Sequence, residues 1–325
     1  MSKAIRIHQP GGPEVLRWED VEVGEPGAGQ VRIRHGAVGL NYIDVYHRTG
    51  LYPLPSLPWT LGMEGAGRIE AIGEGVADLK VGDRVAYASP PVGAYAEVRL
   101  MPADRVVKLP DAIDDKTAAA MMLQGMTAQY LLRRTYRVQP GDAILFHAAA
   151  GGVGLIAGQW ARHLGATVIG TVGSDEKAEL ARTHGYQHVI VYSRENFTER
   201  VREITNGQGV AVVYDSVGKD TFMGSLDALR PMGMMVSFGN ASGLVPPFEP
   251  GILSAKGSLF LTRPTLMTYT AQRDDLVASA NELFDVVKSG AVKIEVRQTY
   301  PLAETAQAHR DLEARKTTGS TVLLP

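Results

Sequence analysis

Short apolar runs alternate with amphipathic stretches through the middle of the chain. An apolar run at residues 143–146 is followed by a turn of small residues at 148–154, which opens a helical apolar pattern. A second run at 166–172, an amphipathic stretch at 176–184 and a third run at 188–191 repeat this order. Short apolar runs bounded by turn residues predict buried strands, and apolar positions at helical spacing predict helices. The alternation therefore predicts parallel strands joined by crossover helices.

The same alternation continues toward the C-terminus. Apolar runs at 209–214 and 233–238 flank a helical stretch at 222–229, and another run lies at 258–261. Together with the three earlier strands, this predicts an α/β domain with a six-stranded, doubly wound parallel sheet of the Rossmann type over residues 125–262.

The first third of the chain has a different pattern. Residues 31–35, 67–73 and 83–87 alternate apolar and polar positions, and turns rich in glycine and proline separate them. Alternation with a period of two is typical of half-buried strands. This part is predicted to be a β-rich, partly closed barrel.

The last stretch returns to mixed elements. Helices are predicted near 271–289 and 303–314, with strands at 293–296 and 320–324. We expect this stretch to complete the first domain, so the domains are residues 1–124 with 263–325, and residues 125–262. Under that division, the active site is expected in the cleft between the two domains.

The turn at 148–154 carries the first chemical signal. It reads Ala149-x-Gly151-x-x-Gly154, a dinucleotide fingerprint in which alanine replaces the first glycine. A strand, a turn with few side chains and a helix start expose backbone N–H groups to an anion such as a dinucleotide pyrophosphate. The structural alternative is a strand-to-helix turn that needs only positive φ and close packing.

Composition removes several classes of function. The 325-residue chain has 33 Lys and Arg against 35 Asp and Glu, a formal net charge of −2, and no cysteine. No basic tail points to nucleic acid, no apolar run has the length of a membrane span, and the N-terminus does not resemble a secretory signal. We expect a cytoplasmic protein that has neither disulfides nor thiol-ligated zinc.

Several motifs together resemble one family. They are Gly-Gly-Pro-Glu-Val-Leu at 11–16, Val-Gly-Leu-Asn-Tyr-Ile-Asp at 38–44, Pro-Trp-Thr-Leu-Gly-Met-Glu-Gly-Ala-Gly at 58–67, Val-Gly-Asp-Arg-Val at 81–85, the glycine turn, Val-Tyr-Asp-Ser-Val-Gly at 213–218 and Ser-Phe-Gly-Asn at 237–240. Over the whole length, the chain resembles the zinc-free quinone oxidoreductase (zeta-crystallin-like) family of the medium-chain dehydrogenase/reductase superfamily. The resemblance implies a GroES-like first domain and a Rossmann second domain.

The resemblance also bears on metal binding. Zinc-dependent relatives carry a cysteine ligand in the segment where this chain has Asn41, and a histidine ligand where it has Met63. The cysteine-rich lobe that holds their structural zinc is missing as well. No metal site is therefore expected, and His35, His47 and Glu64 are assigned to packing or surface roles.

The end of the second Rossmann strand indicates which cofactor binds. NAD enzymes usually have an acidic residue there for the ribose hydroxyl, whereas this chain has Gly173 and Ser174, with Lys177 following. Space and a positive charge favour a 2′-phosphate, and hence NADPH. The resemblance implies that residues matching Lys177, Tyr192 and Arg315 hold this phosphate; the alternative is that Asp175 binds the ribose of NAD.

Other cofactor-binding positions follow from the resemblance. They are Asn41, Tyr42, Ile43, Asp44, Tyr130, Gly151, Gly152, Val153, Ser216, Phe238, Gly239, Asn240 and Arg263.

The predicted reaction is hydride transfer from NADPH to a quinone, because an electron-poor acceptor needs no metal to polarise it. Asn41, Tyr46 and Tyr52 are the candidate catalytic residues: the amide hydrogen-bonds without ionising, and the tyrosines offer flat faces and hydroxyls. Both tyrosines are equally consistent with partly buried aromatics of the first domain. The alternatives for function are an NADPH-dependent enone or enal reductase and a non-catalytic NADPH-binding protein. A homodimer that pairs through the strand at 258–261 is expected from the family.

Overall fold

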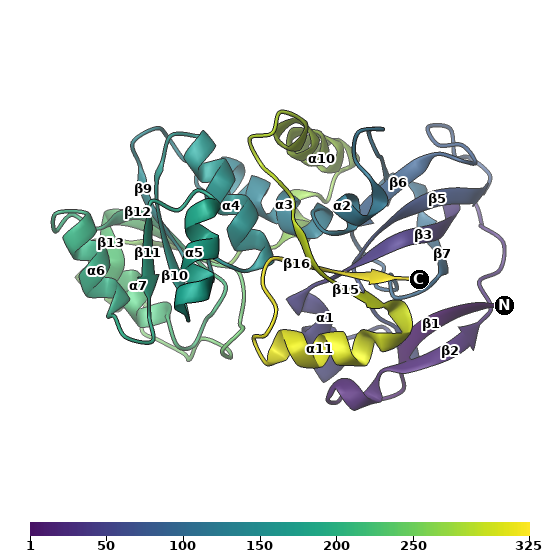
Figure 1. Ribbon diagram of the computed structural model, residues 1–325, viewed down its shortest axis with the longest axis horizontal. Helices are drawn as coiled ribbons and strands as arrows, with labels where there is room; N and C mark the ends of the chain where they lie inside the picture. Colours follow the sequence, from purple (N-terminus) through teal and green to yellow (C-terminus); the bar gives the residue numbers. More distant parts are fainter. The chain divides into compact units, whose positions relative to one another are not determined.

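The computed structural model describes residues 1–325 and separates them into two compact units (Figure 1). The first unit contains Met1–Met126, Thr270–Phe284 and Ile294–Pro325. The second unit contains Thr127–Tyr269 and Asp285–Lys293. Each unit is described by itself below.

The second unit is built on a six-stranded parallel sheet with strand order β11-β10-β9-β12-β13-β14. Its strands are β9 (Ala143–Phe146), β10 (Thr167–Val172), β11 (His188–Val191), β12 (Val210–Asp215), β13 (Leu229–Ser237) and β14 (Phe260–Thr262). Numbered within the unit, this is the order 3-2-1-4-5-6 of a doubly wound dinucleotide-binding sheet. The prediction of a Rossmann sheet is confirmed.

Helices cover both faces of this sheet, with α4 and α5 on one face and α6 and α7 on the other (Figure 1). The helices of the second unit are α4 (Gly152–His163), α5 (Asp175–Thr183), α6 (Phe197–Ile204), α7 (Phe222–Ala228), α8 (Gly251–Ala255) and α9 (Leu266–Tyr269). Sequence analysis missed α6, although Asn196 marks its start: the Asn196 side chain accepts hydrogen bonds from the backbone N–H groups of Thr198 and Glu199.

The first unit holds the remaining strands in two sheets. One has the order β2-β1-β4, and the other, of seven strands, has the order β15-β16-β3-β5-β6-β8 with β7 paired to β3. The strands are β1 (Ser2–Ile7), β2 (Arg17–Val21), β3 (Gln30–Leu40), β4 (Trp59–Thr60), β5 (Glu64–Ile72), β6 (Arg84–Ala88), β7 (Val98–Pro102), β8 (Val107–Lys108), β15 (Val296–Pro301) and β16 (Ser320–Leu324). This β-rich architecture matches the GroES-like prediction.

The strand predicted at residues 293–296 starts three residues too early, because β15 begins at Val296 and runs to Pro301. The backbone of Lys293 is engaged elsewhere: its N–H donates to Gln159 Oε1 at 2.9 Å, and its carbonyl accepts from Gln159 Nε2 at 3.0 Å. These bonds to a side chain take the place of strand pairing at that position.

The helices of the first unit include α1, which follows Asn41. They are α1 (Tyr42–Thr49), α2 (Asp115–Ala119) and α11 (Thr305–Glu313). Two further helices, α3 (Met122–Tyr130) and α10 (Arg273–Lys288), each contain a boundary between the units. The first unit also has the short helical turns η1 (Pro13–Val15), η2 (Ala103–Arg105) and η4 (Leu302–Glu304), whereas the π-helical turn η3 (Leu131–Thr135) belongs to the second unit. Gly50 ends α1 with a φ of 82°, which favours glycine.

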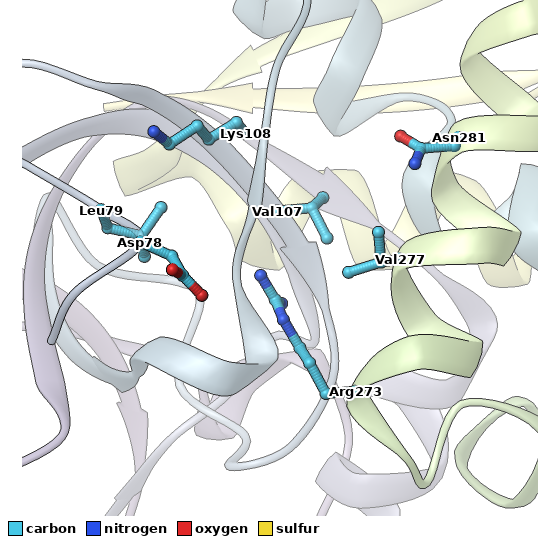
Figure 2. A pocket seen from close by; sticks show the side chains of 7 residues that line it. All are labelled: Asp78, Leu79, Val107, Lys108, Arg273, Val277 and Asn281. Atoms are coloured by element: carbon cyan, nitrogen blue, oxygen red, sulfur yellow. The ribbon is translucent and has the colours of Figure 1, made fainter.

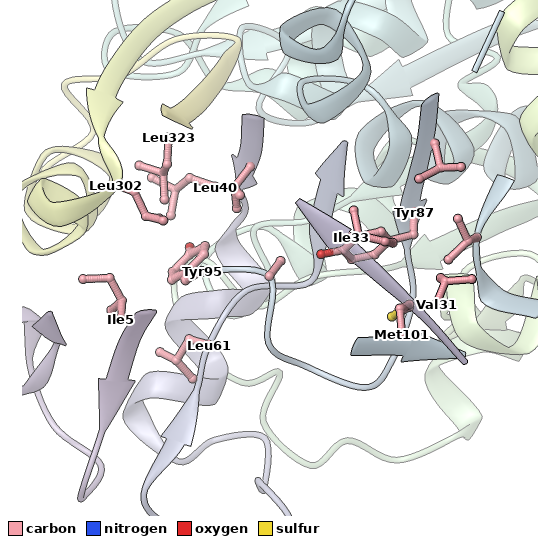
Figure 3. Packing of buried hydrophobic residues seen from close by; sticks show 14 of the residues in the cluster. Ile5, Val31, Ile33, Leu40, Leu61, Tyr87, Tyr95, Met101, Leu302 and Leu323 are labelled. Carbon is pink, nitrogen blue, oxygen red and sulfur yellow. The ribbon is translucent and has the colours of Figure 1, made fainter. Parts of the chain in front are cut away.

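Buried side chains from distant segments form the core of the first unit (Figure 3). Ile5, Ile33 and Leu61 come from the N-terminal third, whereas Leu302 and Leu323 come from the C-terminal stretch, and all five are at most 1% exposed. The C-terminal residues are thus integral to this core, and β16 pairs directly with β3.

Candidate functional site

The glycine turn connects β9 to α4 in the second unit. Its left-handed residue is Ala148, with a φ of 55°, rather than one of the glycines. A Cβ at Gly154 would lie 2.5 Å from the Ala148 carbonyl oxygen and 2.6 Å from that of Ala149, so this glycine is required for close packing. A Cβ at Gly151 would meet only the Ala148 oxygen, at 3.2 Å. No side chain caps α4, so its first N–H groups are suited to an anion.

A buried polar network lies next to this turn. His147 Nδ1 lies 2.8 Å from Thr171 Oγ1, and His147 Nε2 lies 3.0 Å from Ser225 Oγ, which donates to Asp215 Oδ2 at 3.0 Å. Burial lowers the pKa of His147, which Asp215 partly opposes. These bonds tie together the ends of β9, β10 and β12 with α7, so His147 supports the strand ends.

The loops after β12 and β13 approach each other closely. Asp215 Oδ1 accepts from the N–H groups of Val217 at 2.8 Å and Gly218 at 3.0 Å, which shapes the first loop. A Cβ at Gly239 would lie only 2.5 Å from the Ser216 carbonyl oxygen. The predicted positions Ser216, Phe238, Gly239 and Asn240 are therefore brought together at the carboxyl end of the sheet, where open α/β sheets bind ligands.

The end of β10 brings a second set together. A Cβ at Gly173 would lie 2.8 Å from Tyr192 Oη, so these two predicted residues are neighbours. Ser174 is the N-cap of α5 and accepts from the Lys177 N–H at 3.4 Å. Gly173, Ser174, Lys177 and Tyr192 thus belong to one local structure.

Sequence analysis missed Arg194, which lies just beyond this set. Its guanidinium donates to both carboxylate oxygens of Asp175, at 2.8 and 2.6 Å. The pair is exposed, and Arg194 lowers the pKa of Asp175 through these bonds. An Asp175 carboxylate that accepted from a ribose hydroxyl would therefore share its oxygens with the Arg194 guanidinium. A basic residue directly after the third strand was the signal available in the sequence.

Tyr130 and Arg263 also lie in the second unit. The Tyr130 ring stacks on Tyr269 with centroids 4.6 Å apart. Burial raises the pKa of Tyr130, and the neighbouring positive charge of Arg263 opposes the shift. Arg263 itself donates to the Ser237 carbonyl at 3.1 Å, at the end of β13. Arg315 belongs to the first unit, where it follows α11 with a φ of 58°.

In the first unit, the predicted tyrosines Tyr42, Tyr46 and Tyr52 lie on α1 or shortly after it. The rings of Tyr42 and Tyr46 are 5.5 Å apart, and those of Tyr46 and Tyr52 are 5.1 Å apart, both edge to face. Tyr46 is 9% exposed, whereas Tyr52 is half-buried. The three rings form one aromatic cluster beside Ile43, the second residue of α1.

Asn41 and Asp44 lie at the start of the same helix and are buried. Asp44 Oδ2 accepts from the Asn41 N–H at 2.9 Å and from Tyr95 Oη at 2.8 Å, while its Oδ1 has no partner. Burial raises the pKa of Asp44 to about 7. The Asn41 side chain donates to Glu64 Oε2 at 2.6 Å and accepts from Gln124 Nε2 at 3.1 Å.

Glu64 was assigned to packing or the surface from sequence, and Gln124 was not singled out. Glu64 is fully buried, and burial raises its pKa to about 8 against hydrogen bonds from Asn41 and the Leu123 N–H. A charge-capable residue inside the apolar Leu61–Ala66 segment was the signal that could have marked it. Glu64 and Gln124 are the residues that sequence reasoning missed around Asn41.

The raised pKa of Glu64 predicts a pH dependence of stability. Its folded-state pKa of about 8 lies above the ordinary value of 4.5 for a glutamate, so the stabilising contribution of the protonated acid is complete below pH 4.5 and is lost as pH rises through 8. Glu64→Gln removes this contribution and is expected to flatten the loss of stability with rising pH. Urea unfolding of both proteins at several pH values between 5 and 9 measures it; parallel curves would contradict the prediction. The raised pKa of Asp44 also lowers stability as pH rises, but it does so equally in the wild type and in Glu64→Gln and therefore cancels in the comparison.

A separate hollow of about 260 Å³ lies in the first unit between β8, the Asp78–Leu79 loop and α10 (Figure 2). It is lined by Asp78, Leu79, Val107, Lys108, Arg273, Val277 and Asn281, none of which is a predicted site residue. The structure has no group of three or more His, Cys, Asp or Glu side chains arranged to hold a metal ion. None of its helices has the length and apolar character needed to cross a membrane.

Comparisons with known proteins agree with this fold. Residues 27–111 match the alcohol dehydrogenase GroES-like domain, and residues 152–284 match the zinc-binding dehydrogenase family. A quinone oxidoreductase of Pseudomonas aeruginosa is 56% identical over the full length of both chains. A 2-haloacrylate reductase of a Burkholderia species is 51% identical, covering 100% of this chain and 99% of that protein.

A solved structure gives the same result. The structure of Escherichia coli quinone oxidoreductase complexed with NADPH superimposes with a TM-score of 0.98 at 49% sequence identity, covering 99% of this chain and 100% of that one. Identity at this level over the whole length, with both units matched, establishes the relationship. The chain is an oxidoreductase and belongs to the quinone oxidoreductase family of the medium-chain dehydrogenase/reductase superfamily.

Proposed function

We propose that this protein is an NADPH-dependent quinone reductase. The observation that carries the proposal is the end of β10, where Gly173, Ser174, Lys177 and Tyr192 replace the acidic residue typical of NAD enzymes. The relative from Escherichia coli, whose structure contains NADPH, supports it.

The residues of the second unit suit the proposed cofactor. The uncapped N–H groups of Gly152 and Val153 at the start of α4 are suited to the pyrophosphate. The Gly151 N–H donates to the Ala148 carbonyl at 2.9 Å, so we assign Gly151 to the close approach of the backbone to the ligand. We assign the 2′-phosphate to Ser174, Lys177 and Tyr192 of the second unit. When bound, NADPH supplies the hydride from C4 of its nicotinamide.

In the first unit, we assign Asn41, Tyr46 and Tyr52 to the nicotinamide and acceptor end. The Asn41 amide orients its partner by hydrogen bonding, while the edge-to-face tyrosines offer apolar faces that exclude water and hydroxyls that can donate a proton. We propose that the reaction needs no metal: a carboxamide and the buried thioether of Met63 are poor zinc ligands compared with thiolate and imidazole.

Lys177→Ala tests the cofactor assignment. Removal of a cation that pairs with a 2′-phosphate is expected to raise the KM for NADPH about tenfold and leave the KM for NADH unchanged, because NADH lacks that phosphate. Steady-state kinetics with both cofactors measures the change. Lys219→Ala, which removes a lysine from the loop after β12, is the matched control. An unchanged preference for NADPH would contradict the role of Lys177.

The acceptor is tested with a panel of quinones and α,β-unsaturated carbonyls under NADPH. We expect quinones to give the higher kcat/KM. A second candidate is reduction of activated enones or enals, which the relationship to 2-haloacrylate reductase favours. Efficient turnover of enones with idle quinones would select that candidate, whereas tight NADPH binding without any turnover would indicate a non-catalytic protein.

We also propose a homodimer formed through β14. This strand ends the parallel sheet and therefore has an unpaired edge, and its Phe260 side chain is 57% exposed. Light scattering of the wild type and of Leu261→Pro measures the mass; a monomeric wild type would contradict the proposal.

A further inference from the structure

The Asn41 side chain is held by groups from four separate segments of the first unit. Asn41 precedes α1, Glu64 begins β5, Gln124 lies in α3, and Ser320 begins β16. As placed in the structure, Asn41 Nδ2 lies 2.6 Å from Glu64 Oε2, Gln124 Nε2 lies 3.1 Å from Asn41 Oδ1, and Ser320 Oγ lies 2.6 Å from Gln124 Oε1. The nitrogen and oxygen ends of each amide have nearly the same shape, so each amide also fits when rotated by half a turn. All four residues are at most 7% exposed. Water therefore cannot readily substitute for a lost partner.

The chain around Glu64 is shaped to hold its carboxyl group. The Leu123 N–H donates to Glu64 Oε1 at 2.8 Å. A Cβ at Gly39 would lie 2.3 Å from Glu64 Oε2 and 2.3 Å from the Ala119 carbonyl oxygen, so only glycine leaves room for this carboxyl group. The position of Glu64 is thus fixed from both sides.

The hydrogen bonds that run from Ser320 through Gln124 and Asn41 to Glu64 can be donated in either of two directions. Ser320 Oγ also lies 2.8 Å from the Ala120 carbonyl, which only accepts, and a hydroxyl has a single hydrogen to donate. If Ser320 donates to Gln124, both amides point their N–H groups toward Glu64, whose two oxygens then accept from Asn41 and from the Leu123 N–H, an arrangement that suits a carboxylate. If Ser320 donates to Ala120, both amides are rotated by half a turn and Glu64 must donate a proton to Asn41.

We propose that Glu64, Gln124 and Ser320 are positioning residues that fix the Asn41 amide, and that the proton on Glu64 sets which end of this amide donates. This proposal rests on one part of the proposed function, namely that Asn41 contacts the cofactor or the acceptor. It extends that function by identifying the groups that orient Asn41.

The surroundings of Glu64 favour the protonated form at neutral pH. Its pKa of about 8 results first from burial, and the ionisable groups that act on it or lie near it are Asp44, Tyr87 and Tyr95. None of these is a cation. With the acid protonated, every hydrogen from Glu64 to Ser320 has an acceptor, and the Ala120 carbonyl also accepts from Ser320.

Infrared spectroscopy of the cofactor-free protein tests the proton. The wild type is expected to show a carbonyl band of a buried carboxylic acid that is lost near pH 8, separate from that of Asp44 near pH 7. Glu64→Gln should remove the band lost near pH 8, while Glu70→Gln should keep it. Glu70 lies on the same strand but pairs with Arg34 outside the network. Persistence of the band in Glu64→Gln would overturn the proposal.

Kinetics test the positioning. At saturating NADPH, Gln124→Met and Glu64→Leu are expected to lower kcat about tenfold with little change in the KM for quinone, because the amide loses its orientation. Glu64→Gln, which can still donate to Asn41, should recover most of this loss and remove the fall in kcat near pH 8. Wild-type kcat in the two disruptive variants, verified as folded by thermal unfolding, would overturn the proposal. An absence of quinone turnover in the wild type would instead contradict the proposed function, and the infrared result would still decide the state of Glu64.

Discussion

Gly151→Val is expected to weaken NADPH binding at least about a hundredfold without unfolding the protein. Gly151 is the N-cap of α4 with a φ of −80°, a conformation that any residue adopts. Its added Cβ would meet one protein atom, the Ala148 carbonyl oxygen at 3.2 Å, which a shift of a few tenths of an ångström relieves. The branched side chain would instead occupy the space in front of the first N–H groups of α4, where the phosphate is proposed to bind. Fluorescence titration with NADPH measures the affinity.

Gly154→Ala is the matched control on the same turn. Its Cβ would press against two backbone oxygens at 2.5 and 2.6 Å, so it is expected to lower the stability of the second unit by about 2 kcal/mol. Gly151→Val is therefore expected to affect mainly NADPH binding, whereas Gly154→Ala is expected to affect mainly the stability of the second unit. Wild-type NADPH affinity in Gly151→Val would show that the turn does not hold the pyrophosphate.

Glu313→Gln is expected to destabilise the first unit by about 2 kcal/mol, since Arg48 is buried whereas Glu313 is 31% exposed and partly screened by water. Arg48 is only 1% exposed and donates to both Glu313 carboxylate oxygens, each at 2.8 Å. Its other partners, His309 Nδ1 at 3.0 Å and the Gly11 carbonyl at 3.0 Å, are neutral, and burial lowers the pKa of His309 to about 3. The variant therefore leaves a buried cation without its counter-charge. Urea unfolding of the wild type and the variant measures the loss.

The double variant Arg48→Met with Glu313→Gln distinguishes an unpaired charge from simple loss of contacts. Because it removes both charges, it should be more stable than Glu313→Gln alone. A double variant less stable than the single one would show that packing, rather than the ion pair, accounts for the effect. The pair joins α1 to α11, so its loss should also loosen the contact between these two helices.

Much of the second unit could be predicted because its signals are local. Each strand is a short apolar run, each helix follows a turn, and the order of strands then restricts the sheet to few topologies. The same reasoning placed the start of β15 three residues too early, at Lys293, whose backbone is bonded to the side chain of Gln159, 134 positions earlier in the chain. It also left Arg194 unassigned, since its partner Asp175 lies 19 positions earlier in the chain.

By itself, the sequence determined the doubly wound sheet, the β-rich first unit, the glycine turn between β9 and α4 and the acid-free end of β10. These features depend on periodicity and on residue types close together in the chain. Only the tertiary structure decided that Ala148 adopts the left-handed conformation, that Tyr192 lies against Gly173, and that Asn41 is enclosed by Glu64 and Gln124. Such contacts join segments far apart in sequence, and their hydrogen bonds depend on how the whole unit packs.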